Sequence, residues 1–131
     1  MRQQFFFKEV ARQGNDVLMI SPGQWFDFRV VDQLESYSGP KPGRWTLKAL
    51  RHMNDNIYAF RLLGVKEVVE QFDPDWLYIQ QEPGSTLAVE ALSWKVRKRA
   101  IFTWENIEVK GRGKQDLRSY DLVICGNPEA E

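Results

Sequence analysis

Small and polar side chains follow several short apolar runs of this chain, and their types suit them to binding a ligand. Four such stretches occur, at residues 21–25, 81–85, 103–106 and 126–129. Serine, threonine, asparagine, glutamate and glycine fit poorly in a core but form hydrogen bonds readily, and a following helix start adds backbone donors. The four stretches are therefore candidate binding loops.

The stretch that begins at Thr103 is the most informative. Trp104 offers an apolar face, Glu105 a carboxylate and Asn106 an amide, directly after an apolar run. Sugar sites use this combination, because sugar rings stack on aromatic faces while carboxylates and amides bind hydroxyls. The alternative is a surface loop with Trp104 folded inward. Glu105 could act as a base, but no partner in the sequence would shift its pKa, so no residue is assigned as catalytic.

Short apolar runs alternate with helically spaced stretches along the chain. The pattern predicts strands at 16–21, 45–50, 76–80, 100–103 and 121–125. It predicts helices at 3–14, 55–72, 86–98 (capped by Ser85) and 114–119, and one more that begins at Asn127. Residues 24–44 show no regular pattern. The alternation is typical of βαβ units, so we expect an α/β fold with a mostly parallel sheet and helices on both faces. Ligands bind such sheets at the carboxyl ends of the strands.

The composition is that of one globular domain spanning residues 1–131. Hydrophobic residues make up 43% of the chain, and 18 basic residues balance 18 acidic ones, which argues against nucleic acid as a partner. The chain has one cysteine (Cys125) and one histidine (His52), so we expect no disulfide and no metal site. The sequence also shows no signal sequence and no long apolar stretch. Together with the single cysteine, this favours a cytoplasmic location.

Four cations gather within residues 95–99. The first interpretation is a solvated helix end, where the macrodipole favours positive charge. The alternative is a phosphate-binding or membrane-surface patch, which would place the protein at the inner face of the membrane. Neither phosphate-cradling motif, G-x-x-x-x-G-K-[ST] or G-x-G-x-x-G, occurs, so we expect no bound cofactor.

Two runs near the end of the chain, FTWENI (102–107) and DLVICGNPEA (121–130), together form a recognisable sequence pattern. They resemble the amino-terminal domain of GT-B glycosyltransferases of the retaining "group 1" or family-four type. The runs FKEVARQGNDVLMISP (7–22) and DPDWLYIQQEP (73–83) resemble earlier segments of that domain. The resemblance covers nearly the whole chain in the right order, although each motif is short.

The resemblance implies a Rossmann-like domain that forms the acceptor side of a two-domain cleft. A sugar acceptor and a nucleotide-sugar donor would be the partners of the intact, hexosyltransferase-type enzyme. By position, the residues that would line this cleft are Glu82, Thr103, Trp104, Glu105, Asn106, Gly126 and Asn127. Stabilisation of the leaving diphosphate would need the second domain, so we expect this chain alone to be inactive.

The chain departs from the family pattern at both ends. The family's first strand and glycine-rich turn should precede residue 3, and the donor-binding domain should follow residue 131, so a truncated domain is expected. A missing central strand leaves two facing sheet edges unpaired. We therefore expect the sheet either to close by pairing 17–20 with 76–79 or to take a strand from another molecule. Two separate half-sheets would contradict this expectation.

A second interpretation is a non-catalytic α/β interaction module. Its contact surface would contain Trp25, Phe26, Phe28 and Trp104, and an exposed sheet edge or this aromatic surface could form a homo-oligomer. A flavodoxin-like or receiver-like domain is disfavoured, because no acidic pair follows a first strand and no flavin-cradling loop is present.

Overall fold

The computed structural model describes residues 2–25, 27–56, 58–103 and 117–126. The fold is mixed α/β, and contacts divide the chain into two compact units, Met1–His52 and Met53–Glu131. Up to Leu50 the elements are α1 (Arg2–Arg12), β1 (Asp16–Pro22), β2 (Gln24–Trp25), β3 (Phe28–Arg29), β4 (Gln33–Tyr37) and β5 (Gly43–Leu50). From His52 onward they are β6 (His52–Met53), β7 (Arg61–Leu62), α2 (Val65–Phe72), β8 (Trp76–Ile79), α3 (Thr86–Ala91), β9 (Lys98–Thr103), a 3-10 turn (Leu117–Ser119) and β10 (Leu122–Cys125).

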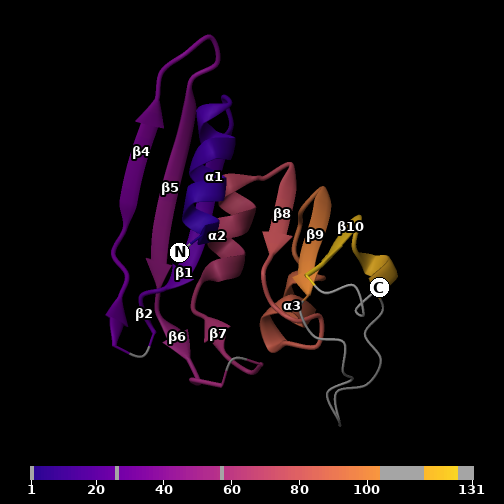
Figure 1. Ribbon diagram of the computed structural model, residues 1–131. Helices are drawn as coiled ribbons and strands as arrows, with labels where there is room; N and C mark the ends of the chain where they lie inside the picture. Colours follow the sequence, from indigo (N-terminus) through magenta and orange to yellow (C-terminus); the bar gives the residue numbers. More distant parts are fainter. Residues whose placement is uncertain (1, 26, 57, 104–116, 127–131) are drawn as a thin grey trace. The chain divides into compact units, whose positions relative to one another are not determined.

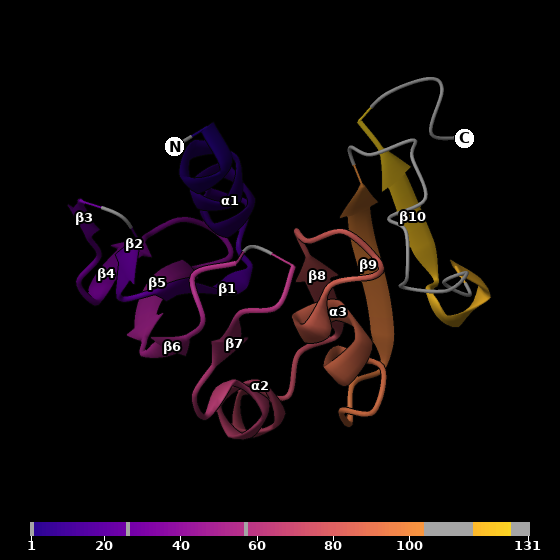
Figure 2. The same ribbon diagram turned by 90° about the horizontal axis from the view of Figure 1, so that it is seen from below.

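The first unit is built on a three-stranded sheet in the order β1-β5-β4 (Figure 1). β1 runs parallel to β5 from Asp16 opposite Arg44 to Pro22 opposite Leu50, and β4 runs antiparallel to β5. α1 packs over β1 and β5 (Figure 2). The predicted helix at 3–14 and the predicted strands at 16–21 and 45–50 are confirmed.

The core of this unit lies between α1 and β5. Ala11 and Trp45 are completely buried, and Leu47 nearly so. The indole Nε1 of Trp45 donates a hydrogen bond to Met19 Sδ at 3.0 Å, so the ring nitrogen has a partner inside the core. Helix and sheet lie in close contact at Gly43, where an added Cβ would overlap the carbonyl oxygen of Ala11.

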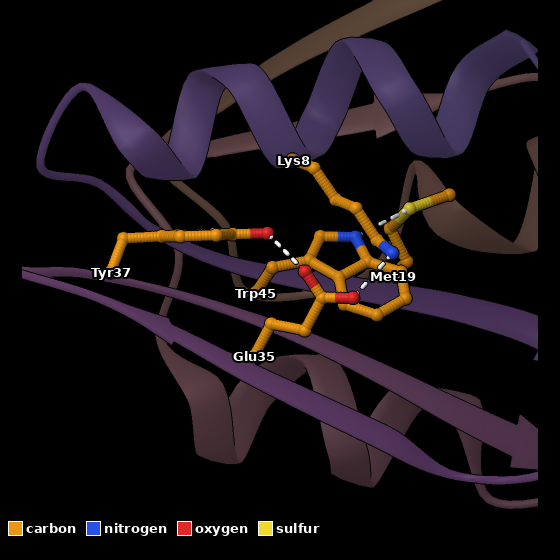
Figure 3. Close-up of polar contacts among 5 residues, drawn as sticks. All are labelled: Lys8, Met19, Glu35, Tyr37 and Trp45. Carbon is orange, nitrogen blue, oxygen red and sulfur yellow. Dashed lines mark hydrogen bonds and ion pairs between the residues drawn. The ribbon is translucent and has the colours of Figure 1, made fainter.

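A polar cluster joins α1 to β4 beside this core (Figure 3). Lys8 Nζ lies 2.5 Å from Glu35 Oε1 and 4.4 Å from the centre of the Trp45 ring. The Tyr37 hydroxyl donates to Glu35 Oε2 at 2.5 Å. Arg12, one helical turn after Lys8, lies over the Tyr37 ring at 4.9 Å. Charge pairing therefore anchors α1 to a strand that the sequence pattern did not predict.

The second unit contains a fully parallel sheet in the order β10-β9-β8. The predicted strands at 76–80, 100–103 and 121–125 are confirmed as β8, β9 and β10. α3 connects β8 to β9 as the crossover helix, and it starts at the predicted cap, where Ser85 accepts a hydrogen bond from the Ala88 N–H. β6 and β7 form a separate two-stranded sheet.

The predicted helix at 55–72 is wrong over its first half. The side chains of Asn54 and Asn56 accept hydrogen bonds from backbone N–H groups two residues later and so form turns. Leu62 lies in β7 instead, and Gly64 has a φ of 77° immediately before α2 begins at Val65. Only the second half of the apolar stripe is helical, with Val65 and Val69 buried.

The predicted helix at 86–98 is too long. α3 ends at Ala91, because the following turn tightens to i→i+3 bonds such as Trp94 N–H to Ala91 O. Arg99 then binds the carbonyl oxygens of Ala91 and Trp94 from β9, at 3.1 and 2.5 Å. Lys98 and Arg99 are strand residues, so the interpretation of 95–99 as a helix end is also wrong. Of the predicted helix at 114–119, the described part is the 3-10 turn; the helix from Asn127 lies outside the described residues.

The predicted closure of the sheet is wrong. Residues 17–20 pair with β5 and residues 76–79 pair with β9, in two different three-stranded sheets. The other alternative, a strand taken from another molecule, is not tested by a single chain and stays a prediction.

Candidate functional site

The carboxyl ends of β8, β9 and β10 bring together three of the predicted binding residues. Thr103, the last residue of β9, donates a hydrogen bond from its hydroxyl to Glu82 Oε2 at 2.5 Å. The backbone N–H of Gly126, directly after β10, donates to the carbonyl oxygen of Thr103 at 2.8 Å. Three strand ends that are well separated in the sequence thus meet at Thr103.

The parallel register is what places these residues side by side. Ile79 pairs with Ile101, and Cys125 pairs with Thr103, so all three strands end at the same edge of the sheet. β8 ends before the other two, and residues 82–85 then turn back, with the Ser85 N–H donating to the Glu82 carbonyl oxygen at 2.9 Å. This turn holds the Glu82 side chain against the end of β9.

Burial differs across the site in a way that suits binding. Thr103 is 5% exposed and Ser85 is 1% exposed, so both are part of the packed scaffold. Glu82 is half-buried and Gly126 is exposed. A buried hydroxyl that holds a half-buried carboxylate in one orientation is a preorganised hydrogen-bonding group.

The chemistry of this site is that of recognising hydroxyl groups. A carboxylate and a hydroxyl oxygen are both hydrogen-bond acceptors, and the Thr103 hydroxyl donates its proton to Glu82. Such acceptors match the O–H donors of a sugar or polyol. Cys125 is half-buried and pairs with Thr103 on the neighbouring strand.

The scaffold under the site is made of α3 and its neighbours. The Tyr120 hydroxyl donates to the carbonyl oxygen of Ala88 at 3.5 Å, which ties the segment before β10 to α3. Burial raises the pKa of Tyr120, so the phenol stays protonated at neutral pH. The Thr86 N–H donates to the Tyr58 carbonyl oxygen at 2.8 Å and fixes the start of α3 from the other side.

Four of the predicted binding residues, Trp104, Glu105, Asn106 and Asn127, lie outside the described residues. Their roles stay predictions. At the strand end at 21–25, the Gly23 N–H donates to the Leu50 carbonyl oxygen at 2.8 Å, and the Gly23 carbonyl oxygen accepts from the Val30 N–H.

The basic cluster at 95–99 is largely paired at the other end of β9. Arg97 forms ion pairs with Asp73 and Asp75 at 3.0 and 2.9 Å. Lys98 lies over the Trp76 ring at 5.1 Å. The contacts of Arg97 and Lys98 therefore give no support to the alternative of a phosphate-binding patch.

Two further features bear on function. Within the described ranges, no group of three or more His, Cys, Asp or Glu side chains is arranged to hold a metal ion. Among the helices that the structure describes, none has the length and apolarity needed to cross a membrane. Comparisons of the chain with protein-family models, with curated proteins and with solved structures found no match.

Proposed function

We propose that this chain is the acceptor-side, Rossmann-like domain of a GT-B glycosyltransferase of the retaining group 1 type. Its sugar acceptor would bind at the carboxyl ends of β8, β9 and β10. The observation that carries the proposal is the hydrogen bond between Thr103 and Glu82, next to the Gly126 backbone. In the intact enzyme a nucleotide-sugar donor would supply the hexosyl group.

The architecture of the second unit supports this proposal. Three adjacent parallel strands with a helical crossover form the arrangement in which α/β proteins bind ligands beyond the strand ends. The motif DPDWLYIQQEP places Glu82 after β8, and FTWENI places Thr103 at the end of β9. The site therefore combines the residues on which the family resemblance depends.

Binding of simple sugars tests the proposal. The full chain would be titrated calorimetrically with a panel of methyl hexosides, alongside the variants Glu82→Gln and Glu90→Gln. Glu90 is a matched control in the same unit, because it pairs with Arg61 at 3.0 Å and not with Thr103. Hydrogen bonds to a charged group contribute about 1.5–3 kcal/mol, so Glu82→Gln should weaken binding by about 10- to 100-fold.

Equal loss of binding in both variants, or no binding of any hexoside, would contradict the proposal. Glu90→Gln should leave affinity within about twofold of the wild type, since a surface pair contributes about 0–1 kcal/mol to stability.

An interaction module is the second candidate, favoured by one observation. Phe28, in β3, is 66% exposed although it is a large apolar residue. In that case Phe28→Ser would abolish capture of a protein partner and Glu82→Gln would not, whereas a glycosyltransferase domain would respond to Glu82→Gln alone.

A further inference from the structure

β1 is an edge strand whose composition is that of an interior strand. Within the described residues it pairs only with β5. Its central run is Val17-Leu-Met-Ile20, which is apolar on both faces of the sheet, as in strands with neighbours on either side. All four residues are nevertheless only half-buried, while Trp45 and Leu47 of β5 are buried.

The backbone hydrogen bonds show which groups face the open edge. The Asn15 carbonyl oxygen accepts from Arg44, and the Gly23 N–H donates to Leu50, so the odd-numbered residues of this stretch face β5. In a parallel strand the N–H and C=O of one residue point to the same side, and the side alternates. Asp16, Leu18 and Ile20 therefore direct their N–H and C=O groups outward.

The middle of the edge, at Leu18 and Ile20, lacks the features that usually prevent strand addition, because the charged Asp16 and Pro22 lie only at its two ends. Among its outward-directed residues there is no lysine, and the pairing with β5 is continuous, without a bulge. Pro22 has no N–H and contributes only its carbonyl. The open edge is thus a short apolar strand with donors and acceptors in alternation.

The flank of α1 on the same side is also apolar. Lys8 and Arg12 point toward β4, where they contact Glu35 and Tyr37. Phe6 lies two residues before Lys8, and Val10 lies two residues before Arg12. Two residues correspond to a rotation of about 200° around the helix, so Phe6 and Val10 lie on the flank toward β1. Phe6 is 63% exposed, so this flank of α1 carries a large exposed aromatic side chain.

We propose that the β1 edge binds the β1 edge of a second copy of this chain, antiparallel, with the two-fold axis at Met19. In this register Leu18 faces Ile20 of the second copy, and Asp16 faces its Pro22. Each outward N–H then meets an outward carbonyl, and the missing donor of Pro22 falls at the end of the ladder.

Self-complementarity is what identifies a second copy as the partner. The register places Leu18 opposite Ile20 and Met19 opposite its own symmetry mate, whereas Asp16 does not face its own symmetry mate. Strands in a sheet lie roughly 4.7–4.9 Å apart. Because α1 lies over β1 and β5, the two helices would be roughly 10 Å apart, close to the 8–10 Å of packed helices. Phe6 and Val10 of both copies would be buried between them.

Disulfide cross-linking tests the register directly. Met19 faces its symmetry mate in a non-hydrogen-bonded pair, where Cα atoms lie about 4.5 Å apart, within the range for a disulfide. In a Cys125→Ser background, Met19→Cys should form a covalent dimer under mild oxidation at micromolar concentration. Leu18→Cys is the matched control: Leu18 faces Ile20 of the second copy, so it should remain at least tenfold less cross-linked.

Sedimentation measures the same association without cysteine chemistry. The unmodified chain should form a dimer whose fraction rises with concentration. Leu18→Pro should raise the dissociation constant of this dimer at least tenfold. Proline at 18 removes only an outward N–H, so β5 pairing and the circular dichroism spectrum should persist. If Leu18→Pro does not fold, Ile20→Lys gives the same test by placing a charge at the edge.

A chain that remains monomeric at all concentrations, or equal cross-linking of the two cysteine variants, would overturn the proposal.

Discussion

At the scale of single residues, Thr103 is the most constrained member of the candidate site. It is buried, it orients Glu82 through its hydroxyl, and its carbonyl oxygen accepts from Gly126. These are three separate demands on one short side chain and its backbone. Because the position is buried, the side chain must be small, and because it orients Glu82, it must carry a hydroxyl group.

Replacement of Thr103 by valine keeps the shape and removes the hydroxyl. We expect a loss of about 1–2 kcal/mol in the free energy of unfolding, because the Glu82 carboxylate loses a donor at its half-buried position. Thr103→Ser, which retains the hydroxyl, should lose less. Chemical denaturation of both variants measures the difference, and equal stability of Thr103→Val and wild type would show that the hydrogen bond is not formed.

The Glu35 cluster predicts a specific response to acid. The hydrogen bond from Lys8, and then that from Tyr37, hold the pKa of the Glu35 carboxyl below its usual value. A lowered pKa in the folded state stabilises the protein above the unfolded pKa of about 4.3, and this contribution is lost as pH falls through the folded pKa. Glu35→Gln should therefore melt at a lower temperature than wild type at pH 7.

The melting temperatures of the two proteins should converge as the pH falls through the lowered pKa of folded Glu35, where this carboxyl becomes protonated in the wild type as well. Glu9→Gln, which removes an exposed ion pair with Arg12, is the control and should differ little from wild type at any pH. A constant gap between wild type and Glu35→Gln across the pH range would contradict the assignment.

At the scale of elements, the docking of α1 on its sheet depends on Gly43. A Cβ at this position would overlap the Ala11 carbonyl oxygen. The overlap cannot be relieved by a side-chain rotation, because the carbonyl is a backbone group and a Cβ is bonded directly to the backbone. Gly43→Ala should therefore destabilise the protein by more than about 2 kcal/mol, as strain in a packed region usually does. Gly39→Ala is the control, since an added Cβ there has no neighbour within 4 Å among the described residues. Thermal melts that fall equally in both variants would contradict this account.

The cap of α3 is a second feature at this scale. Ser85→Ala should cost about 0.5–2 kcal/mol, because the Ala88 N–H loses its acceptor in a buried position. Ser93→Ala removes an exposed hydroxyl that donates to Glu90 and should have a smaller effect. Urea denaturation that gives the same midpoint for both variants would argue against a role for the cap.

The elements that the sequence predicted well are those with local signals. Short apolar runs predicted β1, β8, β9 and β10, the less regular run at 45–50 predicted β5, and Ser85 predicted the start of α3. β4 was missed because its inward residues are Glu35 and Tyr37, which show no apolar alternation. The partner of Glu35, Lys8, lies 27 residues earlier, so the interaction that holds this strand against α1 is not local in the sequence.

For the candidate site, too, the features with a local signal were predicted and those without one were not. The sequence placed Glu82, Thr103 and Gly126 at strand ends, and the parallel register brought them together as predicted. The helix at 55–72 was wrong because a helical spacing of apolar residues was overridden by side-chain turns at Asn54 and Asn56. Such turns depend on hydrogen-bond geometry that residue types alone do not determine.

At the scale of the whole molecule, the chain has two units with separate sheets and separate buried residues. Trp45 and Leu47 form the centre of one core, while Ile101 and Ala88 are buried in the other unit. Loss of packing in the first unit should therefore spread weakly to the second. In Gly43→Ala, hydrogen exchange should accelerate in β1 and β5 while the amides of β8 and β9 remain protected. Equal acceleration in all four strands would show that the chain unfolds as one cooperative unit.

The central claim is that a sugar acceptor binds where β8, β9 and β10 end. Amide chemical-shift mapping of the full ¹⁵N-labelled chain with a panel of methyl hexosides tests it most directly. The account predicts saturable shifts at Glu82, Thr103 and Gly126, which disappear in Glu82→Gln, and little change in β1 or β5. Shifts confined to the first unit, or no saturable shift at these three residues with any hexoside, would contradict it.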